Sequence, residues 1–408
     1  MVSQDMRATR HGAAPGGRAG DAPLLRKLNL AATVRAFLDH TSLTVSEVCS
    51  IVGVSRPTAE ELLATLLSEG FVREVRGRPD GERSAGRPAR RFEAVAEDFT
   101  VVGIDIGAHK VAVAICDLRG NVVAVRRRSV DSSLEPAGRI GAAVRLVKTA
   151  VRQSGKSWAQ IRAMACGITG VIANGAEVRD LRTVPAGQDL DVYSLPGFDD
   201  IDVASEVSER FKHDVLISND IFLAAAGEQW KGAATEARDL VYMHAGRRLG
   251  AAIVIGGQIH NGRRGLAASV GAMKILGWAD AMAQLDHESR KLAGSTAGES
   301  TGEDLRALFE AAANGDRTAV RTVDRVAEAL ALGASTLVHA VDPDLVVLGG
   351  GLSRTGNVLA DPFQRHLAAT SLDLPEFRVS LLGDESVALG AARLALDDFK
   401  ARLLAVQA

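Results

Sequence analysis

Residues 44–75 read TVSEVCSIVGVSRPTAEELLATLLSEGFVREV, and their pattern decides the fold of the N-terminal part of the chain. The run TVSE places a threonine hydroxyl three residues before Glu47, which is the capping box that begins a helix. Gly53 is able to adopt the left-handed conformation that ends such a helix. Ser55 then caps a second helix and puts Pro57 in its first turn, where a missing N–H costs nothing. The stretch therefore predicts a short helix, a glycine turn and a longer helix.

Apolar residues at helical spacing precede this stretch and predict one more helix from Leu24 onward. Its expected buried face comprises Leu25, Leu28, Val34, Phe37 and Leu38. Residues 71–75 and 91–95 have the composition of two strands that enclose a basic segment. The predicted elements follow one another as a helix, a short helix, a glycine turn, a further helix and a hairpin. This order is typical of a winged helix-turn-helix domain, which we place at residues 22–96. Residues 1–21 lack periodicity and are rich in Gly, Ala and polar groups, so we expect a disordered tail there.

Positive charge is concentrated in this N-terminal part of the chain. Residues 1–96 hold 14 Lys and Arg against 11 Asp and Glu, whereas the remainder holds 34 against 39. Within residues 71–92, seven arginines face three acidic residues among several Gly and Pro. A hairpin with this composition is expected to carry positive charge on an exposed ribbon, where it attracts phosphates.

The winged plan predicts which side chains meet double-stranded DNA. The N-terminal residues of the third helix face base edges in the major groove, so we expect Ser55, Arg56 and Thr58 there. Arg56 is the one able to make a bidentate contact with guanine. At the hairpin tip we expect arginines beside phosphates or in a narrow minor groove: Arg83, Arg87, Arg90 and Arg91. The alternative is a small helical bundle that binds protein; the glycine turn, the SRPT start and the arginine-rich wing together favour DNA.

A second domain is predicted over residues 97–408. FTVVGIDIGAHKVAVAICDLRGNVVAVRRR, residues 99–128, indicates three successive strands. Beyond it, short strands and helices alternate, which is typical of an α/β fold with two related halves. The expected strands are 163–167, 215–218, 240–244 and 251–255, and the expected helices are 140–152, 201–211, 221–232, 301–312 and 317–341.

This second domain resembles the ROK family (repressor, open reading frame, kinase), which has the two-lobed actin-like, ribonuclease H-like α/β fold of sugar kinases. The matching residues are DIGAHK at 105–110 for the first phosphate loop, Ser218-Asn219-Asp220 for the segment of the sugar and the catalytic base, and the glycines at 349–351. Gly86-Arg87-Pro88 is similar to the wing of the ROK regulators. The resemblance covers roughly residues 22–400 and implies a boundary between the lobes near 220–240.

Two departures from the ROK kinases affect the phosphate loops. The kinases have Asp-Ile-Gly-Gly-Thr-Lys in the first loop, where this chain has Ala108 and His109 in place of the second Gly and the Thr. Their second loop has a Gly-Thr-Gly core, where this chain has Arg247 and Arg248. The side chains at these four positions would obstruct the approach of the nucleotide phosphates to the backbone of the loops. The resemblance therefore implies that ATP is not positioned for in-line transfer.

A third departure affects the sugar and metal sites. The Glu and His of the kinase segment Gly-Glu-x-Gly-His correspond to Ser269 and Ala272 here. The zinc site that follows in the family needs that His and a cysteine cluster, and residues 272–300 contain no cysteine. We therefore expect no metal and no cofactor. His287 is expected to be a surface or otherwise satisfied histidine.

Asp220 keeps the position of the kinase base, and three roles are open to it. It is expected to accept a hydrogen bond from a ligand hydroxyl or to cap a helix, which aspartate also does well. The third role, taking the proton of an attacking sugar hydroxyl, would need both altered sites to work.

The resemblance implies a sequence-specific transcriptional regulator, a repressor of carbohydrate-related metabolism, with a catalytically inactive kinase-like domain. That domain is expected to make a homodimer or a dimer of dimers on a palindromic operator. It is also expected to sense a sugar or sugar phosphate through Asn219, Asp220, Arg247, Arg248 and Ser269. The alternatives are an ATP-dependent sugar kinase with an appended DNA-binding domain and a regulator that only dimerises and binds no ligand.

The distribution of apolar residues and cysteines indicates the cellular compartment of the protein. No run of about 18 apolar residues occurs, and the basic residues at the N-terminus are not followed by an apolar stretch. The three cysteines, Cys49, Cys116 and Cys166, are far apart and in apolar contexts, which argues against a disulfide framework or a cysteine zinc site. We therefore expect a cytoplasmic protein, associated with the nucleoid through DNA.

Overall fold

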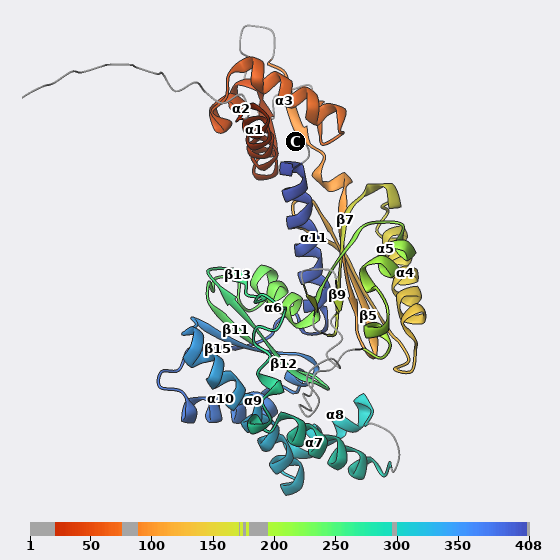
Figure 1. The fold of residues 1–408 in the computed structure, drawn as a ribbon, viewed down its shortest axis with the longest axis vertical. Coiled ribbons are helices and arrows are strands. Elements are labelled where there is room, and N and C mark those ends of the chain that lie inside the picture. The colour runs from red at the N-terminus through yellow and green to blue at the C-terminus, as the bar shows by residue number, and fades with distance from the viewer. Residues whose placement is uncertain are drawn as a thin grey trace, which may run out of the picture. The chain divides into compact units, whose positions relative to one another are not determined.

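The computed structural model describes residues 21–75, 89–170, 172–173, 177–178, 195–295 and 300–405. The chain divides into two compact units, which are drawn in Figure 1. The first unit combines Met1–Val95 with Lys400–Ala408, and the second is Ala96–Phe399. The tail predicted for residues 1–21 lies outside the described residues apart from Asp21, where the first helix begins.

The first unit is a winged helix-turn-helix, as predicted. Its elements are α1 (Asp21–Asp39), β1 (Ser42–Thr44), α2 (Val45–Val52), α3 (Arg56–Ser68), β2 (Val72–Val75) and β3 (Arg91–Ala94). The three strands form an antiparallel sheet in the order β1-β3-β2. Strand β1 is too short to have been expected from the sequence, and its pairing with β3 fastens the hairpin to the helices.

The capping signals read from the sequence act as predicted. The Glu47 N–H donates to Thr44 Oγ1 at 3.2 Å, and the Thr44 N–H donates to Glu47 Oε2 at 2.6 Å, which completes the capping box. Gly53 ends α2 with φ 74°. The helices then close over one apolar core, in which Phe37, Val48 and Leu66 are fully buried.

The face predicted for α1 is partly wrong. Leu25 and Leu28 are exposed and Leu38 is half-buried, whereas Leu30, Val34 and Phe37 are buried. From Leu25, where the description of side-chain burial begins, the first buried residue is Leu30, so this part of α1 extends beyond the small core that the rest of the helix covers. Helical spacing alone does not reveal where a helix leaves its core.

The second unit begins with a five-stranded sheet in the order β10-β7-β4-β5-β6. Its strands are β4 (Thr100–Ile106), β5 (Lys110–Asp117), β6 (Val122–Ser129), β7 (Ile161–Ile168) and β10 (Val215–Asn219). Central β4 is antiparallel to β5 and parallel to β7. Helices α4 (Pro136–Gln153) and α5 (Val203–Phe211) lie on one face of this sheet (Figure 1).

A second sheet, in the order β13-β12-β11-β14-β15, repeats this arrangement. Its strands are β11 (Leu240–Ala245), β12 (Leu249–Ile255), β13 (Gln258–Ile259), β14 (Leu345–Gly349) and β15 (Glu376–Val379). Central β11 is antiparallel to β12 and parallel to β14, as β4 is to β5 and β7. The helices of this lobe are α7 (Trp278–Ala293), α8 (Gly302–Ala313), α9 (Arg317–Val341) and α10 (Asn357–Thr370). The repetition confirms the predicted two-lobed α/β fold.

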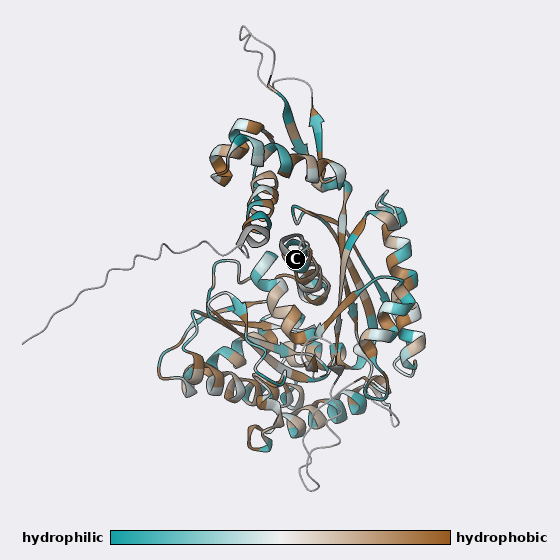
Figure 2. Ribbon diagram, turned by 45° about the horizontal axis from the view of Figure 1, so that its top comes forward, coloured by the Kyte–Doolittle hydropathy of each residue, from teal (hydrophilic) through white to brown (hydrophobic). Residues whose placement is uncertain are grey.

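Hydrophobic residues mark the strands of both sheets and one side of the covering helices, as Figure 2 shows. In the first lobe they form a core around Ile104 and Val147, and in the second a core around Leu330 and Phe363. Each sheet is thus stabilised mainly by apolar area removed from water between strands and helices.

Two further helices, α6 (Asp220–Lys231) and α11 (Ser386–Ala405), pack closely against each other and against β4. A Cβ added to Gly390 would lie 1.8 Å from the Leu223 carbonyl oxygen, and one added to Gly227 would lie 2.2 Å from that of Ser386. At Gly103 of β4 an added Cβ would lie 2.0 Å from the Ala388 carbonyl oxygen. Only glycine allows this close backbone approach. Because α6 follows β10 directly in the chain, its N-terminus lies at the carboxyl end of β10 in the first sheet.

Candidate nucleic-acid interface and ligand pocket

The start of α3 presents the three polar side chains that the sequence predicts for base contact. Ser55 caps the helix by accepting the Thr58 N–H, and the hydroxyls of Ser55 and Thr58 lie 2.8 Å apart. Arg56 is two-thirds exposed and donates from Nε to Glu60 Oε1 at 3.1 Å. Such an exposed ion pair contributes only about 0.3–0.5 kcal/mol to the free energy of unfolding. Breaking it so that the guanidinium can contact a DNA base therefore costs little.

The wing arginines are placed differently from the prediction. Arg83 and Arg87 lie outside the described residues. Arg90 and Arg91 lie at the base of the hairpin and not at its tip, because Arg91 already pairs with Val75 in the β2–β3 ladder.

Both of these basal arginines have partners within the first unit. Arg90 makes a fork with Glu74, with Nε–Oε1 and Nη2–Oε2 distances of 2.9 and 2.8 Å, and these hydrogen bonds raise the pKa of its guanidinium further. Arg91 donates to the Ser42 carbonyl and hydroxyl and lies 3.4 Å from Glu47 Oε1. Arg91 therefore joins the wing to β1 and α2.

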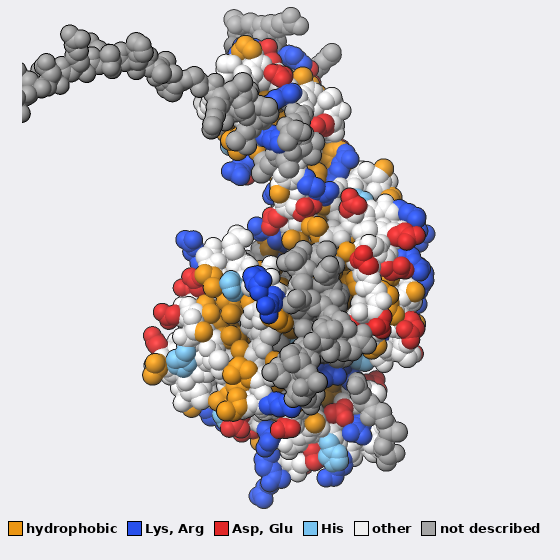
Figure 3. Space-filling view, viewed as in Figure 1, with side chains coloured by type: hydrophobic (Ala, Val, Ile, Leu, Met, Phe, Trp, Pro, Cys, Tyr) orange, Lys and Arg blue, Asp and Glu red, His pale blue; other side chains and the backbone are white. Residues whose placement is uncertain are grey.

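Charges of both signs are interspersed on the face of the molecule drawn in Figure 3, in both units. On this face neither unit is uniformly basic.

A pocket of about 430 Å³ lies in the second unit, where its two lobes meet. The five residues predicted to hold an effector all line it: Asn219, Asp220, Arg247, Arg248 and Ser269. Side chains that the sequence did not single out complete the lining, among them Thr169, Trp278, Asp286 and Ser300. The volume suits a ligand of the size of a sugar or sugar phosphate.

The α6 end of the pocket is ordered by hydrogen bonds. Asn219 caps α6 by accepting the Ile221 and Phe222 N–H groups, and its Nδ2 donates to the Gly170 carbonyl at 2.7 Å. The helix-cap role considered for Asp220 thus belongs to Asn219. Asp220 follows in the first turn, where Oδ1 accepts the Ile221 N–H at 2.9 Å and Oδ2 accepts the Thr169 hydroxyl at 2.6 Å.

The far end of the pocket contains the carboxylate of Asp286. It accepts the Ser300 N–H at 2.7 Å and Arg290 Nε at 2.9 Å. Burial opposes ionisation, but the hydrogen bonds from Ser300 and Arg290 and the charge of Arg290 hold the pKa of this carboxyl below its usual range. The pocket therefore combines two acids, Asp220 and Asp286, with the arginines of the opposite loop.

The second phosphate loop of the kinases is a tight turn in this chain. The Gly246 N–H donates to the Arg248 carbonyl, and β12 begins at the next residue, Leu249. Both arginines line the pocket, as the sequence predicts. His244, just before the turn, is half-buried, and the loss of solvent around its imidazole lowers the pKa of that group.

The first loop is held by a buried arginine that the sequence reading missed. Arg139 of α4 is fully buried and donates from Nη1 to the carbonyls of Gly107 and Ala108 at 2.9 and 2.6 Å. Its other nitrogens donate to the carbonyls of Ser132 and Leu134. The carbonyls of the loop therefore point at α4. In the sequence, the only signal that Arg139 holds this loop was a charged residue in the polar–apolar pattern of α4.

Asp105 and Lys110 flank the same loop. Asp105 is almost completely buried, and its Oδ2 lies 3.5 Å from Lys110 Nζ. Burial raises the pKa of Asp105 to about 6, against the opposing effect of Lys110. No group of three or more His, Cys, Asp and Glu among the described residues is placed to hold a metal ion.

Comparison with known proteins agrees with this architecture. Residues 101–398 match the ROK family, and residues 31–76 match the IclR helix-turn-helix domain. The chain is 23% identical over 407 residues to a putative xylose repressor of Caldicellulosiruptor sp. (strain Rt8B.4), covering 94% of this chain and 98% of that protein.

Two solved structures share the fold. A ROK family transcriptional regulator, a homologue of the E. coli MLC protein, has a TM-score of 0.66 at 15% identity, covering 94% of this chain and 99% of that chain. A ROK family glucokinase from Streptomyces griseus, in complex with glucose and AMPPNP, has a TM-score of 0.57 at 23% identity, covering 73% and 99%.

A helix-turn-helix domain joined to a two-lobed sugar-kinase-like unit defines a DNA-binding transcription regulator. The chain belongs to the ROK family, which confirms the resemblance seen in the sequence. None of the helices in the described part of the chain is long and apolar enough to cross a membrane.

Proposed function

We propose that this protein is a transcriptional repressor that binds an inverted-repeat operator as a homodimer and responds to a sugar or sugar phosphate. The observation that carries the DNA part is the exposed start of α3, where Ser55, Arg56 and Thr58 stand together on a correctly capped helix. Repression and a sugar signal are supported by the similarity to a putative xylose repressor over nearly the whole chain.

The ligand part of the proposal is supported by the pocket in the second unit. Carboxylates recognise sugar hydroxyls, and arginines recognise phosphate or carboxylate groups. Asp220 and Asp286 provide the first kind of group and the 247–248 turn the second. We expect a ligand to favour one closure of the two lobes and so to change the affinity for DNA.

A third part of the proposal is that the kinase-like unit does not transfer phosphate. Support comes from the loop at 246–250, where two arginines replace the small residues that approach a nucleotide, and from Ser269 and Ala272 in the sugar segment. The second candidate function, an ATP-dependent sugar kinase, is favoured by one observation. Asp220 lines the pocket, where a kinase needs a general base to take the proton of the sugar hydroxyl.

The DNA proposal is tested by selecting bound fragments from a random double-stranded library with the full-length protein. We expect an enriched inverted repeat with half-sites about one helical turn, or a multiple of it, apart. Enrichment of no sequence would contradict it. Repeating the selection with a panel of sugars and sugar phosphates tests the ligand part, because an effector is expected to lower the recovery of the same operator.

A further inference from the structure

A buried carboxylate joins the last turns of α6 to the segment that precedes α11. Glu228 of α6 is fully buried. Its Oε2 accepts the Ala233 N–H at 2.8 Å and the Leu381 N–H at 3.3 Å. Its Oε1 accepts the Leu382 N–H at 3.1 Å and the hydroxyl of Ser380. Four donors therefore hold this carboxylate, as the burial of a charge requires.

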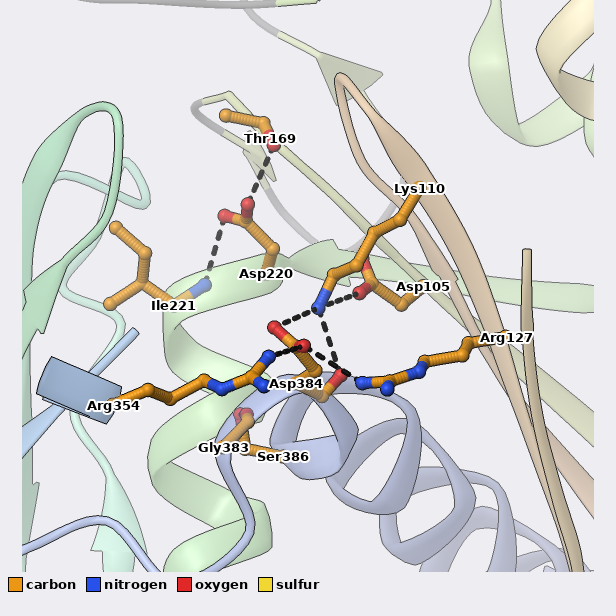
Figure 4. A network of polar contacts seen from close by, with 10 residues as sticks. All are labelled: Asp105, Lys110, Arg127, Thr169, Asp220, Ile221, Arg354, Gly383, Asp384 and Ser386. Atoms are coloured by element: carbon orange, nitrogen blue, oxygen red, sulfur yellow. Dashed lines mark hydrogen bonds and ion pairs between the residues drawn. The ribbon is translucent and has the colours of Figure 1, made fainter. Parts of the chain in front are cut away.

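The Ser380 hydroxyl extends this network to the start of α11. Ser380 Oγ also accepts the Gly383 N–H at 2.9 Å. Ser386, the first residue of α11, donates from Oγ to the Gly383 carbonyl at 2.9 Å, and Figure 4 shows both residues at this turn. If Glu228 moved without the turn, it would become a buried charge that lacks its donors, which is strongly disfavoured. The carboxylate and the turn are therefore expected to move together.

Close contacts along α6 leave little room for it to slide against α11. A Cβ added to Gly227 would lie 2.2 Å from the Ser386 carbonyl oxygen, and one added to Gly232 would lie 2.0 Å from Glu228 Oε2. Tightly packed elements have few voids into which one can shift past the other. We therefore expect α6 and α11 to behave as one rigid pair.

The two ends of this helix pair belong to different functional parts of the chain. Asp220, in the first turn of α6, lines the pocket and accepts the Thr169 hydroxyl (Figure 4). Glu228 follows eight residues later, about 12 Å further along the helix. At the other end, α11 extends to Ala405, and Lys400 onward is grouped with the winged helix-turn-helix in the first unit. The pair thus includes residues of the pocket and residues of the DNA-binding unit.

We propose that α6 and α11, fastened to each other by Glu228, transmit the occupancy of the pocket to the DNA-binding unit, with Glu228 as the positioning residue of this relay. The inference rests on the proposed ligand response and adds the element that carries it. A ligand that contacts Asp220 shifts the first turn of α6, and Glu228 passes this shift to the turn before α11. Neither Glu228 nor Ser380 is among the residues that line the pocket, so changing either one leaves the ligand contacts in place.

The test measures ligand binding and DNA binding separately in the full-length protein. Fluorescence anisotropy gives the Kd of the selected operator without a probe and with saturating xylose, glucose or glucose 6-phosphate. Calorimetry without DNA gives the Kd of each probe. The ratio of the operator Kd values with and without a probe measures the coupling, and allosteric proteins commonly have ratios of about 5 to 150. We expect such a ratio for at least one of these probes in the wild-type protein.

Glu228→Gln keeps the size of the side chain but replaces one acceptor oxygen with an amide NH₂ group, which cannot accept from main-chain N–H groups. We expect this variant to keep the Kd of the probe and the probe-free Kd of the operator within about twofold of wild type, while the coupling ratio falls below about twofold. The matched control is Glu236→Gln, which changes the next glutamate along the chain, an exposed one. The control should keep the wild-type ratio.

Ser380→Ala keeps the test decisive if Glu228→Gln fails to fold. It removes only the hydroxyl between Glu228 and Gly383, so the coupling ratio should fall by about half or more with both Kd values unchanged. A wild-type ratio in the folded variants would overturn the relay. A loss of probe affinity in Glu228→Gln as large as the loss of coupling would also overturn it, because Glu228 would then act on the pocket itself.

Failure of the proposed function gives a different result in the same experiment. A wild-type protein whose operator Kd is altered by none of the probes would contradict the proposed ligand response, and the relay with it, before any variant is compared. A wild-type response that persists in Glu228→Gln and Ser380→Ala would overturn the relay alone.

Discussion

The hydroxyl of Thr169 donates a 2.6 Å hydrogen bond to Oδ2 of Asp220, while Oδ1 of the same carboxylate accepts the N–H of Ile221. Both oxygens thus already have a partner before any ligand binds. A carboxylate can still accept a further hydrogen bond at each oxygen, so Asp220 suits a ligand hydroxyl.

We predict that the protein shows no ATP-dependent turnover of hexoses. The physical reasons are the engaged carboxylate of Asp220 and the arginine pair in the loop that would approach the nucleotide. A coupled ATP assay with a hexose panel checks this prediction. Turnover that Asp220→Asn abolishes would contradict it and establish the kinase.

Changing both Arg247 and Arg248 to Ala should weaken the binding of a sugar phosphate by about tenfold or more, because charge-assisted contacts of about 1.5–3 kcal/mol are lost. The free sugar should lose much less. Changing Arg263 and Arg264, an exposed arginine pair nearby in sequence, is the matched control. A thermal-shift titration measures both, since a ligand at 100 times its Kd adds about 2.7 kcal/mol of stability. Equal losses in the two double variants would refute the role of the loop.

Replacing Arg139 by Lys should destabilise the protein by about 3 kcal/mol. Lysine has one nitrogen, which cannot reach four carbonyls, so several buried acceptors lose their donors. Urea unfolding of the full chain gives the change in unfolding free energy. Arg145→Lys, at an exposed position of the same helix, should change it by less than about 0.5 kcal/mol. The account of the first loop fails if the two variants are equally stable.

Asp105 should make the folded state less stable as pH rises. Its pKa is about 6 when folded, against an ordinary value of 3.8, so the folded state holds the proton more tightly. The unfolding free energy therefore falls between about pH 4 and pH 6 and stays lower above that range. Asp105→Asn lacks this titration, so its stability relative to wild type should increase by about 2 kcal/mol from pH 4 to pH 7. Denaturant unfolding at several pH values would contradict this if the difference stayed constant.

Much of the fold follows from local signals in the sequence. The capping box at Thr44, the left-handed Gly53 and the Ser55 cap each fix a helix end through contacts within a few residues. The α9 bounds, Arg317–Val341, coincide with the predicted range because its apolar period is long and regular. Such features need no knowledge of the rest of the chain.

Features set by distant contacts were missed or misplaced. Asp384 meets Lys110, which is 274 residues away, and nothing in the local sequence signals this contact. Arg91 was expected at the wing tip, but it is the first residue of β3 and pairs with Thr44 of β1 and Val75 of β2. The exposed Leu25 and Leu28 reflect how far a small core reaches along α1.

The central claim, that α3 reads DNA through its first residues, is tested most directly by measuring Arg56→Ala. Fluorescence anisotropy on the selected operator and on operators with single base changes gives the discrimination at each position. We predict that Arg56→Ala loses about 1–3 kcal/mol of discrimination at one guanine. Arg306→Ala, which removes an equally exposed arginine paired with Glu310 four residues on, should behave as wild type. Unchanged affinity and unchanged base preference in Arg56→Ala would contradict the claim.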